Sequence, residues 1–506
     1  MGPERLISIN DGPGRRWLFA DQLGPHFLDE PDQPVLLIES RAAFGRRPVH
    51  RRRAHLVLSA LRHRAAELGD QALFVQAGTY REALGQLEQK LGDGLTVCGP
   101  TSWAADRFVR GLPQVTVLPS RGFATSADEF AAWAKGRGRR RLLLEDFYRE
   151  ARVRLDVLMD GDAPAGGRWN FDHENREPPP EGGLNVPPPK PPAEDDIDRQ
   201  VRRDLDAWAK AGQVRFTGQD GPREFPVTRG EALAALRAFV RDRLPAFGPH
   251  QDAMLAADPV LAHSHLSPAL NLGLLDPLEC VRAAEQAYRA GDAPVASVEG
   301  FTRQIIGWRD YVWHLYWYFG EDYRHHNRLR AQRTLPDWFT QLDADAVQAR
   351  CLSDGLAQVR EHGYAHHIIR LMVLGNYALQ RGWNPAEVTE WFHTNFVDGY
   401  DWVMVPNVVG MSQHADGGLM ATKPYAGGGA YINRMSDYCG DCEYRPSVRL
   451  GPQACPFTAG YWAFIDRNAD RFAANPRMGR QVQGAARLKD LDEVVEQERQ
   501  RGSSPP

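Results

Sequence analysis

The chain has 506 residues and a formal net charge of −4 at pH 7, so we expect two domains rather than a single hydrophobic core. The slight negative charge argues against a histone-like protein but permits a local basic face. No stretch of about 18 uncharged apolar residues occurs, and residues 1–14 are polar and interrupted by proline. We therefore expect neither a membrane span nor a secretory signal, and a cytoplasmic protein.

Three arginine-rich segments are candidates for a basic face, at residues 51–53, 137–141 and 324–333. Each of them permits nucleic-acid binding without demonstrating it. A solvated surface is the more common explanation of such a run.

Five short apolar runs recur in the first 120 residues, at 16–20, 35–39, 72–76, 95–98 and 115–118. Helical patterns lie between them, the clearest at 53–68, where apolar residues mark one face. Alternating strands and helices predict a Rossmann-like parallel sheet covered on both sides. We assign residues 1–135 to this α/β domain.

The following residues change character, because glycines surround a proline-dense stretch at 178–192. Such a stretch sustains neither a helix nor a central strand, so we expect an interdomain linker at 136–200. Residues 201–490 read as helical, with start signals at Thr228, followed by Glu231, and at Ser297. The sequence thus predicts an all-α second domain, with a C-terminal tail at 491–506.

Within the second domain, residues 301–319 are unusually rich in tryptophan, tyrosine and phenylalanine. Aromatic side chains on nearly every face indicate a helix that is buried in a large core or lines a cavity for a planar ligand. This stretch alone favours neither interpretation.

The six cysteines are too few for a disulfide framework in so long a chain, so their grouping matters. Cys439 and Cys442 form a C-x-x-C pair, and Cys455 follows with a proline behind it. Cys351 is the best fourth thiolate, since Cys98 lies in an expected strand of the other domain and Cys280 on an amphipathic helix. The spacing predicts a bound metal or cluster and leaves open a zinc site completed by His414.

Six segments spread along the chain carry a resemblance to a known family. They are residues 21–23 (DQL), 167–172 (GRWNFD), 251–255 (QDAML), 303–309 (RQIIGWR), 364–367 (YAHH) and 431–439 (YINRMSDYC). In these segments the chain resembles the bacterial iron–sulfur photolyases and cryptochromes. The resemblance implies an antenna-binding α/β domain, an all-α FAD-binding domain, and a [4Fe–4S] cluster on Cys351, Cys439, Cys442 and Cys455.

The family resemblance implies a monomeric enzyme that uses light to repair (6-4) pyrimidine–pyrimidone photoproducts in UV-damaged DNA, with the lesion flipped out of the duplex. A blue-light photoreceptor without repair activity is the alternative. A zinc-dependent nucleic-acid-binding protein without flavin is a third hypothesis, should the resemblance mislead.

The resemblance also implies which residues contact FAD. His263, Ser264, Leu266 and Ser267 resemble a serine-rich phosphate-binding segment, although the local sequence alone favours a helix N-cap at Ser267. Arg370 and Asp398 resemble an ion pair against the isoalloxazine ring. The remaining expected contacts are Gln304, Trp308, Arg309 and Met404, the last of which stands where a polar or acidic residue is expected near flavin N5.

Proton and electron transfer are expected from four further side chains. The resemblance assigns proton donation to His366 and His367, and on a helix His367 shares a face with Arg370. Trp391 is expected to give an electron to the photoexcited flavin. The distal tryptophan of the family has no counterpart at the aligned position, where Trp338 is the candidate substitute.

Two further sites are implied by the resemblance. Asp21 and Glu39 would lie beside an antenna chromophore, 6,7-dimethyl-8-ribityllumazine, although Ala43 and Arg46 depart from the lumazine-binding pattern. Three carboxylates, Asp172, Glu174 and Asp252, resemble positions linked to Mg²⁺, with plain surface carboxylates as the alternative.

Overall fold

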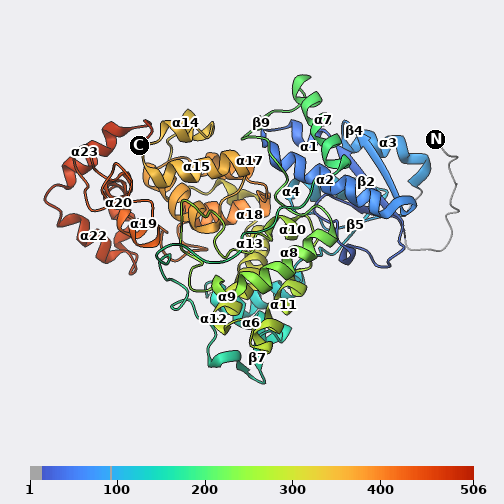
Figure 1. Cartoon of the computed structure of the whole chain (residues 1–506), viewed down its shortest axis with the longest axis horizontal. Helices are drawn as coiled ribbons and strands as arrows, with labels where there is room; N and C mark the ends of the chain where they lie inside the picture. Colours follow the sequence, from blue (N-terminus) through green and yellow to red (C-terminus); the bar gives the residue numbers. More distant parts are fainter. Residues whose placement is uncertain (1–13, 92–93, 139) are drawn as a thin grey trace.

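The computed structural model describes residues 14–91, 94–138 and 140–506. An α/β domain lies at one side of the molecule and the C-terminal helices at the other (Figure 1). The expectation about a secretory signal rests on residues that fall mainly outside the described ranges. None of the helices in these ranges combines the length and the apolar character that a membrane crossing needs.

The α/β domain contains a five-stranded sheet in the order β4-β2-β1-β5-β6, in which every pair of neighbours is parallel. The five predicted strands are thereby confirmed. Their bounds are β1 (Arg16–Leu18), β2 (Val35–Ser40), β4 (Ala72–Ala77), β5 (Leu95–Cys98) and β6 (Val115–Leu118).

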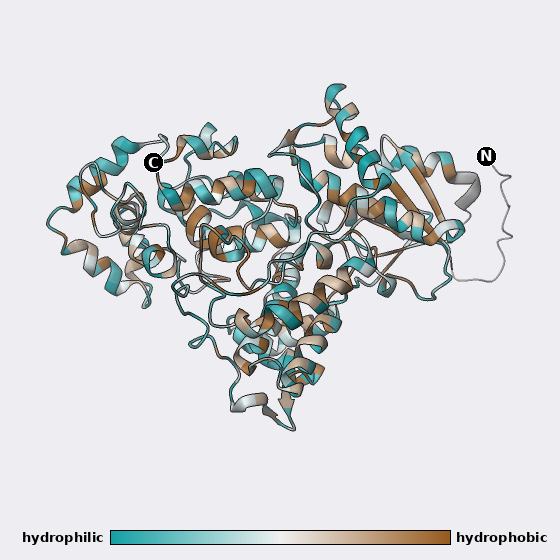
Figure 2. Ribbon diagram, in the orientation of Figure 1, coloured by the Kyte–Doolittle hydropathy of each residue, from teal (hydrophilic) through white to brown (hydrophobic). Residues whose placement is uncertain are grey.

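Helices cover both faces of this sheet, as predicted. Val35 and Leu37 point to the face where α2 (Arg51–Leu68) packs, with Leu61 among its contacts. Leu36 and Ile38 point to the opposite face, where α3 (Tyr80–Leu91) and α4 (Trp103–Arg110) pack. The strands are largely brown, that is hydrophobic, in Figure 2, and the central strands β1 and β2 are buried on both faces. The apolar runs without polar alternation therefore reflect a central parallel sheet.

Residues 196–217, most of which the sequence assigned to the second domain, return to the α/β domain. Helix α7 (Asp196–Lys210) buries Val201 and Leu205 against α2. Further on, β9 (Phe216–Thr217) pairs in parallel with β3 (Val49–His50). The proline-dense stretch itself holds neither a helix nor a strand at residues 172–195, in agreement with its composition.

Helix α6 (Leu144–Leu155) lies inside the segment expected as a linker, so that segment is not irregular throughout. The helix buries Phe147 and Tyr148. Its fully buried Arg152 donates to the carbonyl oxygens of Val157 (3.3 Å), Leu158 (2.5 Å) and Trp169 (2.9 Å). One guanidinium thus satisfies the backbone of the turn that follows the helix.

The second domain is helical, as predicted. Its first half contains α8 (Arg229–Asp242), α9 (Leu244–Phe247), α10 (Ser267–Asn271), α11 (Pro277–Ala290), α12 (Val295–Thr302), η4 (Arg303–Arg309), α13 (Asp310–Phe319) and η5 (Glu321–His325). Its second half contains α14 (Asp337–Thr340), α15 (Arg350–His362), η7 (Ile369–Gly375), α16 (Asn376–Arg381), α17 (Pro385–Asn395), α18 (Asp401–Val405), η8 (Pro406–Ser412), α19 (Gly429–Met435), α20 (Pro456–Arg467), α21 (Ala469–Ala473), α22 (Gly479–Ala486) and α23 (Leu491–Arg501).

The two predicted helix starts fare differently. Thr228 and Glu231 form the expected capping box at the start of α8. The start at Ser297 is wrong, because α12 begins at Val295 after a proline. The Ser297 hydroxyl instead accepts from the Gly248 N–H (2.9 Å) and donates to the Pro245 carbonyl (3.1 Å). The Ser297 side chain therefore makes a tertiary contact and does not cap a helix.

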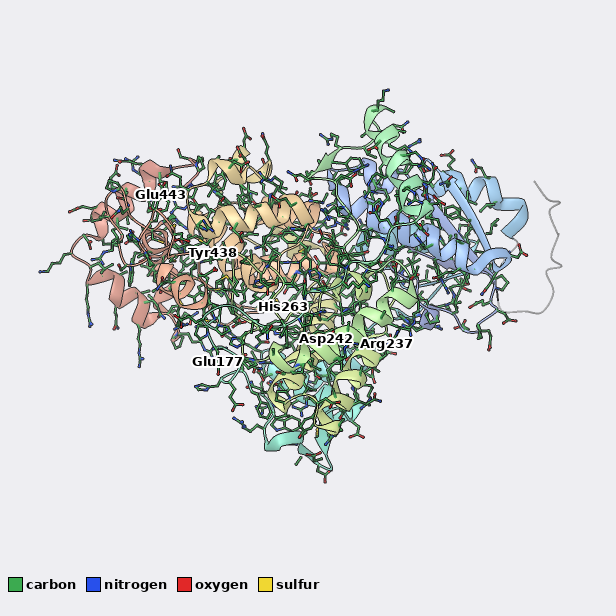
Figure 3. All side chains as sticks on the ribbon, in the orientation of Figure 1. Glu177, Arg237, Asp242, His263, Tyr438 and Glu443 are labelled. Carbon is green, nitrogen blue, oxygen red and sulfur yellow. The ribbon has the colours of Figure 1, made fainter. Side chains whose placement is uncertain are left out.

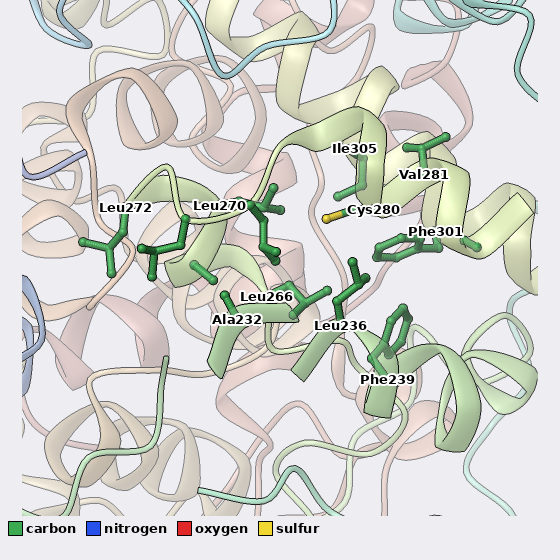
Figure 4. Close-up of a cluster of buried hydrophobic side chains, with 14 of the residues drawn as sticks. Ala232, Leu236, Phe239, Leu266, Leu270, Leu272, Cys280, Val281, Phe301 and Ile305 are labelled. Carbon is green, nitrogen blue, oxygen red and sulfur yellow. The ribbon is translucent and has the colours of Figure 1, made fainter. Parts of the chain in front are cut away.

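A hydrophobic core joins α8, α10, α11 and α12, as Figure 4 shows for Leu236, Phe239, Leu270 and Phe301. Cys280 is buried in the same cluster, and burial raises the pKa of its thiol. It lies apart from the cysteine group, as the sequence predicted.

The aromatic stretch is a core helix over α13, where Tyr311, Trp313 and Tyr316 are buried. Trp313 stacks on Phe123, with ring centroids 4.0 Å apart and planes 9° apart. The core interpretation therefore holds for α13, whereas η4, directly before it, adopts π-helical geometry.

We expect Arg152→Met to lower the free energy of unfolding by about 3 kcal/mol, since it leaves buried carbonyl groups without a donor. Arg149 is exposed on the same helix, so Arg149→Met is a matched control that should change stability little. Urea unfolding followed by circular dichroism measures both. Equal midpoints for the two variants would contradict the role of Arg152.

Candidate functional site

Three histidines from two separate segments meet near the middle of the molecule, where Figure 3 labels His263. One ring nitrogen from each of His263, His366 and His367 lies within 4.8 Å of the others. The centroids of His263 and His366 are 4.6 Å apart. Sequence reasoning paired His366 with His367 but placed His263 with the flavin phosphates, and no local signal could have joined it to the pair.

The helix-face argument for the histidine pair needs correction. His366 precedes the helix, which begins at His367, so the two side chains are not both helical. The His366 carbonyl accepts from the Arg370 N–H (3.2 Å) and its ring is buried. The His367 ring is about half exposed, and its Nε2 lies 3.2 Å from Asp252 Oδ1.

The buried histidines are neutral at physiological pH. Burial, and then the neighbouring His366, lower the pKa of His263 well below its usual range. Burial, and then His367, do the same for the pKa of His366. His263 Nε2 and His366 Nδ1 are buried without a hydrogen-bond partner among the described residues. Both atoms are therefore available to a bound group.

Arg370 and Asp398 form the ion pair that the resemblance implied. The Arg370 guanidinium donates to Asp398 Oδ1 (2.8 Å) and Oδ2 (3.1 Å) in a bidentate arrangement. Its third donor, Nε, bonds to the Ala365 carbonyl (2.6 Å). The guanidinium also lies 4.2 Å from the ring centroid of Phe396, so its position is fixed from several sides.

Ser267 does not cap a helix. It is the first residue of α10, and no side chain caps that helix. Its hydroxyl donates to Asp398 Oδ2 (2.7 Å), and Asn271 Nδ2 donates to the Asp398 carbonyl (3.2 Å). The local preference for an N-cap was wrong, because a carboxylate far along the chain is the better acceptor. Of the neighbouring candidates, Leu266 is buried in the core, and the Ser264 hydroxyl accepts from the Leu266 N–H (3.4 Å).

The remaining expected flavin contacts lie on or near π-helical segments. Gln304 and Trp308 are half-buried on η4. Arg309 donates to the carbonyls of Gly122 (3.0 Å) and Leu270 (3.3 Å), and burial lowers its pKa to about 10. Met404 is buried on α18 in the apolar cluster that contains Trp391.

Trp391 is buried and its Nε1 donates to the Phe339 carbonyl (3.0 Å). Its ring centroid lies 4.4 Å from that of Phe339, which lies 4.7 Å from Trp383. Trp383 in turn lies 6.0 Å from Trp338. Sequence reasoning missed Trp383, which stands alone at the turn before α17, where no motif marks it.

The four selected cysteines line a single small cavity. Cys351 lies at the start of α15, Cys455 directly precedes α20, and Cys439 and Cys442 come from the intervening loop. Tyr438, labelled in Figure 3, lines the same cavity. The structure thus brings together the set that spacing favoured, whereas His414, the candidate fourth zinc ligand, lines a different cavity.

The cysteine cavity is apolar, and its thiols interact. Burial, and then the other three cysteines, raise the pKa of Cys351 well above its usual range. Burial raises the pKa of Cys439 to about 11. No three of the four sulfur atoms lie within 4.8 Å of one another. Tetrahedral zinc with Zn–S bonds of about 2.3 Å holds its sulfurs about 3.8 Å apart, so the spacing is too wide for one ion.

Of the expected antenna residues, Glu39 is buried and Asp21 is half-buried. Asp21 accepts a hydrogen bond from the Thr101 hydroxyl, and burial raises its pKa. Glu39 accepts from Arg62 through both of its oxygens (2.7 Å each) and from Gln76 Nε2 (3.1 Å). Both oxygens of the Glu39 carboxylate therefore already accept hydrogen bonds from protein side chains.

The three carboxylates linked to Mg²⁺ are not assembled into one ligand set. Asp172 lies 3.2 Å from Arg303, Glu174 lies 2.6 Å from Arg168, and Asp252 bonds to His367. Across the described ranges, they belong to no group of three ligand atoms within 4.8 Å.

Comparisons with known proteins agree with this architecture. A family model for deoxyribodipyrimidine photo-lyase-related proteins matches residues 16–215. A (6-4) photolyase of Agrobacterium fabrum is 40% identical over 495 residues, which cover 94% of this chain and 95% of that protein.

Two solved structures share the fold over 98% of this chain. A bacterial class III photolyase from Agrobacterium tumefaciens aligns over 98% of its own length with a TM-score of 0.59 and 16% identity. A cryptochrome from Synechocystis aligns over 100% of its own length with a TM-score of 0.57 and 13% identity. At these identities the two structures support the fold alone.

The buried His366 predicts a pH dependence of stability. In the unfolded chain its pKa is about 6.5, so below that pH the unfolded chain binds more protons than the folded one and stability falls as the pH decreases. His366→Asn should make this fall shallower, by up to about 1.4 kcal/mol per pH unit. Urea unfolding of the holoprotein between about pH 7.5 and 5.5 measures the slope.

The control is His325→Asn, since His325 is exposed on η5. It should keep the wild-type slope. If His366→Asn and wild type lose stability in parallel as the pH falls, His366 is not the buried neutral histidine described above.

Proposed function

Because this chain belongs to the bacterial photolyase family that includes the (6-4) photolyase of Agrobacterium fabrum, we propose that it repairs (6-4) photoproducts in DNA with light. The observation that carries the proposal is 40% identity over nearly the full length of both chains. The three converging histidines support it, since repair of this lesion needs a proton donor.

FAD is the proposed cofactor, and the residues of the site fit it. Three buried polar atoms of the site residues lack a partner among the described residues: His263 Nε2, Arg309 Nε and His366 Nδ1. The Arg370–Asp398 pair adds a carboxylate in a fixed orientation. When bound, FAD supplies the absorption of light and the electron that starts repair.

The protein side chains would hold and orient this group. Asp398 would accept from a ring N–H, while Arg370 and Ser267 keep its carboxylate in place. Gln304, Trp308 and Arg309 would lie along the same ring system, and His263, Ser264, Leu266 and Ser267 near the phosphates. Met404 would place a thioether where relatives have a polar group.

Trp391 is proposed to give up an electron when the flavin is photoreduced, since indole is readily oxidised. Trp338 would be the outer member of the relay. The aromatic series Trp391, Phe339, Trp383, Trp338, with successive centroids 4.4, 4.7 and 6.0 Å apart, supports this route.

His367 is proposed as the proton donor and His366 as its neutral neighbour. Burial keeps a proton off His366, whereas His367 is half exposed and bonded to the Asp252 carboxylate. The carboxylate orients the ring, as the third member of a catalytic triad orients its base. His366, with an unpartnered Nδ1, can accept from or donate to the lesion edge, depending on its tautomer.

A [4Fe–4S] cluster on Cys351, Cys439, Cys442 and Cys455 is proposed in the apolar cavity. The sulfur spacing, too wide for one zinc ion, supports a larger group. Binding would release the protons that these high-pKa thiols otherwise keep, so occupancy would be coupled to pH and to folding.

Two further parts of the proposal concern accessory groups. A 6,7-dimethyl-8-ribityllumazine antenna would lie beside Asp21, with Glu39 acting through Arg62. Mg²⁺ would be shared between lesion phosphates and Asp172, Glu174 or Asp252, each of which exposes part of its surface. UV-damaged DNA is the proposed partner.

Gly429 provides a test of the cluster. A Cβ atom at Gly429 would lie 2.8 Å from Cys455 Sγ and 2.7 Å from Thr458 Oγ1, whereas at Gly428 the nearest atoms are 3.8 Å away. We expect Gly429→Ala to lower the iron content several-fold and Gly428→Ala to leave it unchanged. Iron, zinc and sulfide analysis of the purified proteins measures this. Zinc without iron in the wild type would overturn the cluster assignment.

Repair itself is tested with His367→Ala and duplex DNA carrying one (6-4) lesion. Loss of a general acid commonly costs about 10² to 10⁴ in rate, while flavin content and photoreduction should stay normal. His362→Ala is the matched control, since it removes another half-exposed histidine bonded to a carboxylate, Glu224 at 2.7 Å.

Repair by His367→Ala at more than about a tenth of the wild-type rate would contradict the acid role. If the wild type binds flavin and responds to blue light but repairs no lesion, the photoreceptor hypothesis replaces the repair hypothesis.

A further inference from the structure

A second, larger cavity lies apart from the cysteine cavity and is lined by five arginines. We call it the arginine groove, and its charged residues are Arg141, Arg328, Arg330, Arg471 and Arg477. All five are exposed, and the lining contains no aspartate or glutamate. Segments far apart in the sequence thus converge on one strongly positive surface.

The arginines of the groove lack carboxylate partners, which distinguishes them from their neighbours in sequence. None of the five forms an ion pair within 4.0 Å in the part of the chain that the structure describes. By contrast, Arg137 pairs with Asp146, and Arg324 pairs with Asp401 at 2.5 Å. Five like charges held together without counter-ions favour an anionic ligand.

The three arginine-rich segments found in the sequence differ in their contacts in the structure. In the first segment, Arg51 and Arg52 pair with Asp206 and Glu224, each at 2.5 Å, and Arg53 donates to the His393 carbonyl (2.6 Å). The second contributes Arg141 to the groove, although Arg139 lies outside the described residues. The third contributes Arg328 and Arg330.

The groove is built on a fixed backbone. Asn327 bonds to both the N–H and the carbonyl of Ala331 (2.9 and 2.6 Å) and so closes the loop that carries two of the arginines. Gly417 has a φ of 71°, and a Cβ there would lie 3.1 Å from Arg328 Cγ. Only glycine lets the Arg328 stem lie so close to this turn.

The arginine groove borders the candidate active site. Arg477 donates to the Thr422 hydroxyl (2.9 Å). Three residues further on, Tyr425 packs against the apolar cluster that contains Met254 and Ile368. The segment 422–425 therefore runs from the groove to residues close in sequence to Asp252 and His367.

From this arrangement we infer that the arginine groove binds the sugar–phosphate backbone of the DNA strand that leaves the lesion site. This inference rests on the proposed function and assigns the flanking DNA a location. Guanidinium groups pair well with phosphate oxygens, and backbone contacts position a protein without reading sequence. The net charge of −4 does not oppose binding, because the groove concentrates positive charge locally.

Salt dependence tests this inference. Each phosphate contact adds about 0.9 to the slope of log affinity against log salt. Arg328→Ala/Arg471→Ala/Arg477→Ala should therefore reduce the slope by about 3 and weaken binding to intact and lesion-bearing duplexes in parallel. Fluorescence anisotropy of the flavin-loaded full chain at several NaCl concentrations measures both.

The matched control is Arg237→Ala. Arg237 is another exposed arginine without an ion pair among the described residues, and Figure 3 labels it on α8. It should keep the wild-type slope, and normal flavin content and thermal unfolding show that each variant is folded.

An unchanged slope in the triple variant would overturn the inference, as would poly-glutamate binding as tightly as DNA. If the wild type shows the expected slope but repairs nothing, the proposed function fails while the groove assignment stands.

Discussion

The site depends on one buried carboxylate. Asp398 is almost inaccessible to solvent, and an unpaired charge there would cost several kcal/mol. Arg370 offsets that cost through two parallel hydrogen bonds, and Ser267 supplies a third. These contacts join η7, the start of α10 and the loop after α17. Removing either partner would leave a buried charge, so the three segments hold their relative positions before any ligand arrives.

Three π-helical segments carry or adjoin the expected flavin contacts. Arg370 lies on η7, three of the expected flavin contacts lie on η4, and η8 continues directly from the helix that carries Met404. π-turns are rare in proteins overall but common at functional sites, because the extra residue per turn redirects side chains. They also limit what counting residues along an ideal helix can say about His367 and Arg370. A wheel with 3.6 residues per turn does not describe a helix that begins at His367 and becomes π-helical at Ile369.

Sequence and structure agree where a signal is local and repeated. Apolar runs predict the parallel strands, and the C-x-x-C pair indicates where a cysteine site lies. Contacts between distant segments leave no such signal. Ser267 resembles a cap until Asp398 is seen beside it, and nothing around His263 points to His366. Trp383 is likewise visible only through its neighbours. The family resemblance supplied what local physics could not, because the distant pairings are fixed by the whole fold.

The proposed DNA surface has two parts, a charged arginine groove and a neutral histidine site. The arginine groove gathers guanidinium groups that no carboxylate neutralises, which suits phosphates that stay hydrated. The histidines lie deeper, where burial removes charge from His263 and His366. A base flipped into a charged pocket would have to displace bound water, whereas neutral imidazoles can exchange hydrogen bonds with it at little cost. His367, which is half exposed, lies beside both of these buried histidines and joins them to the solvent-facing side.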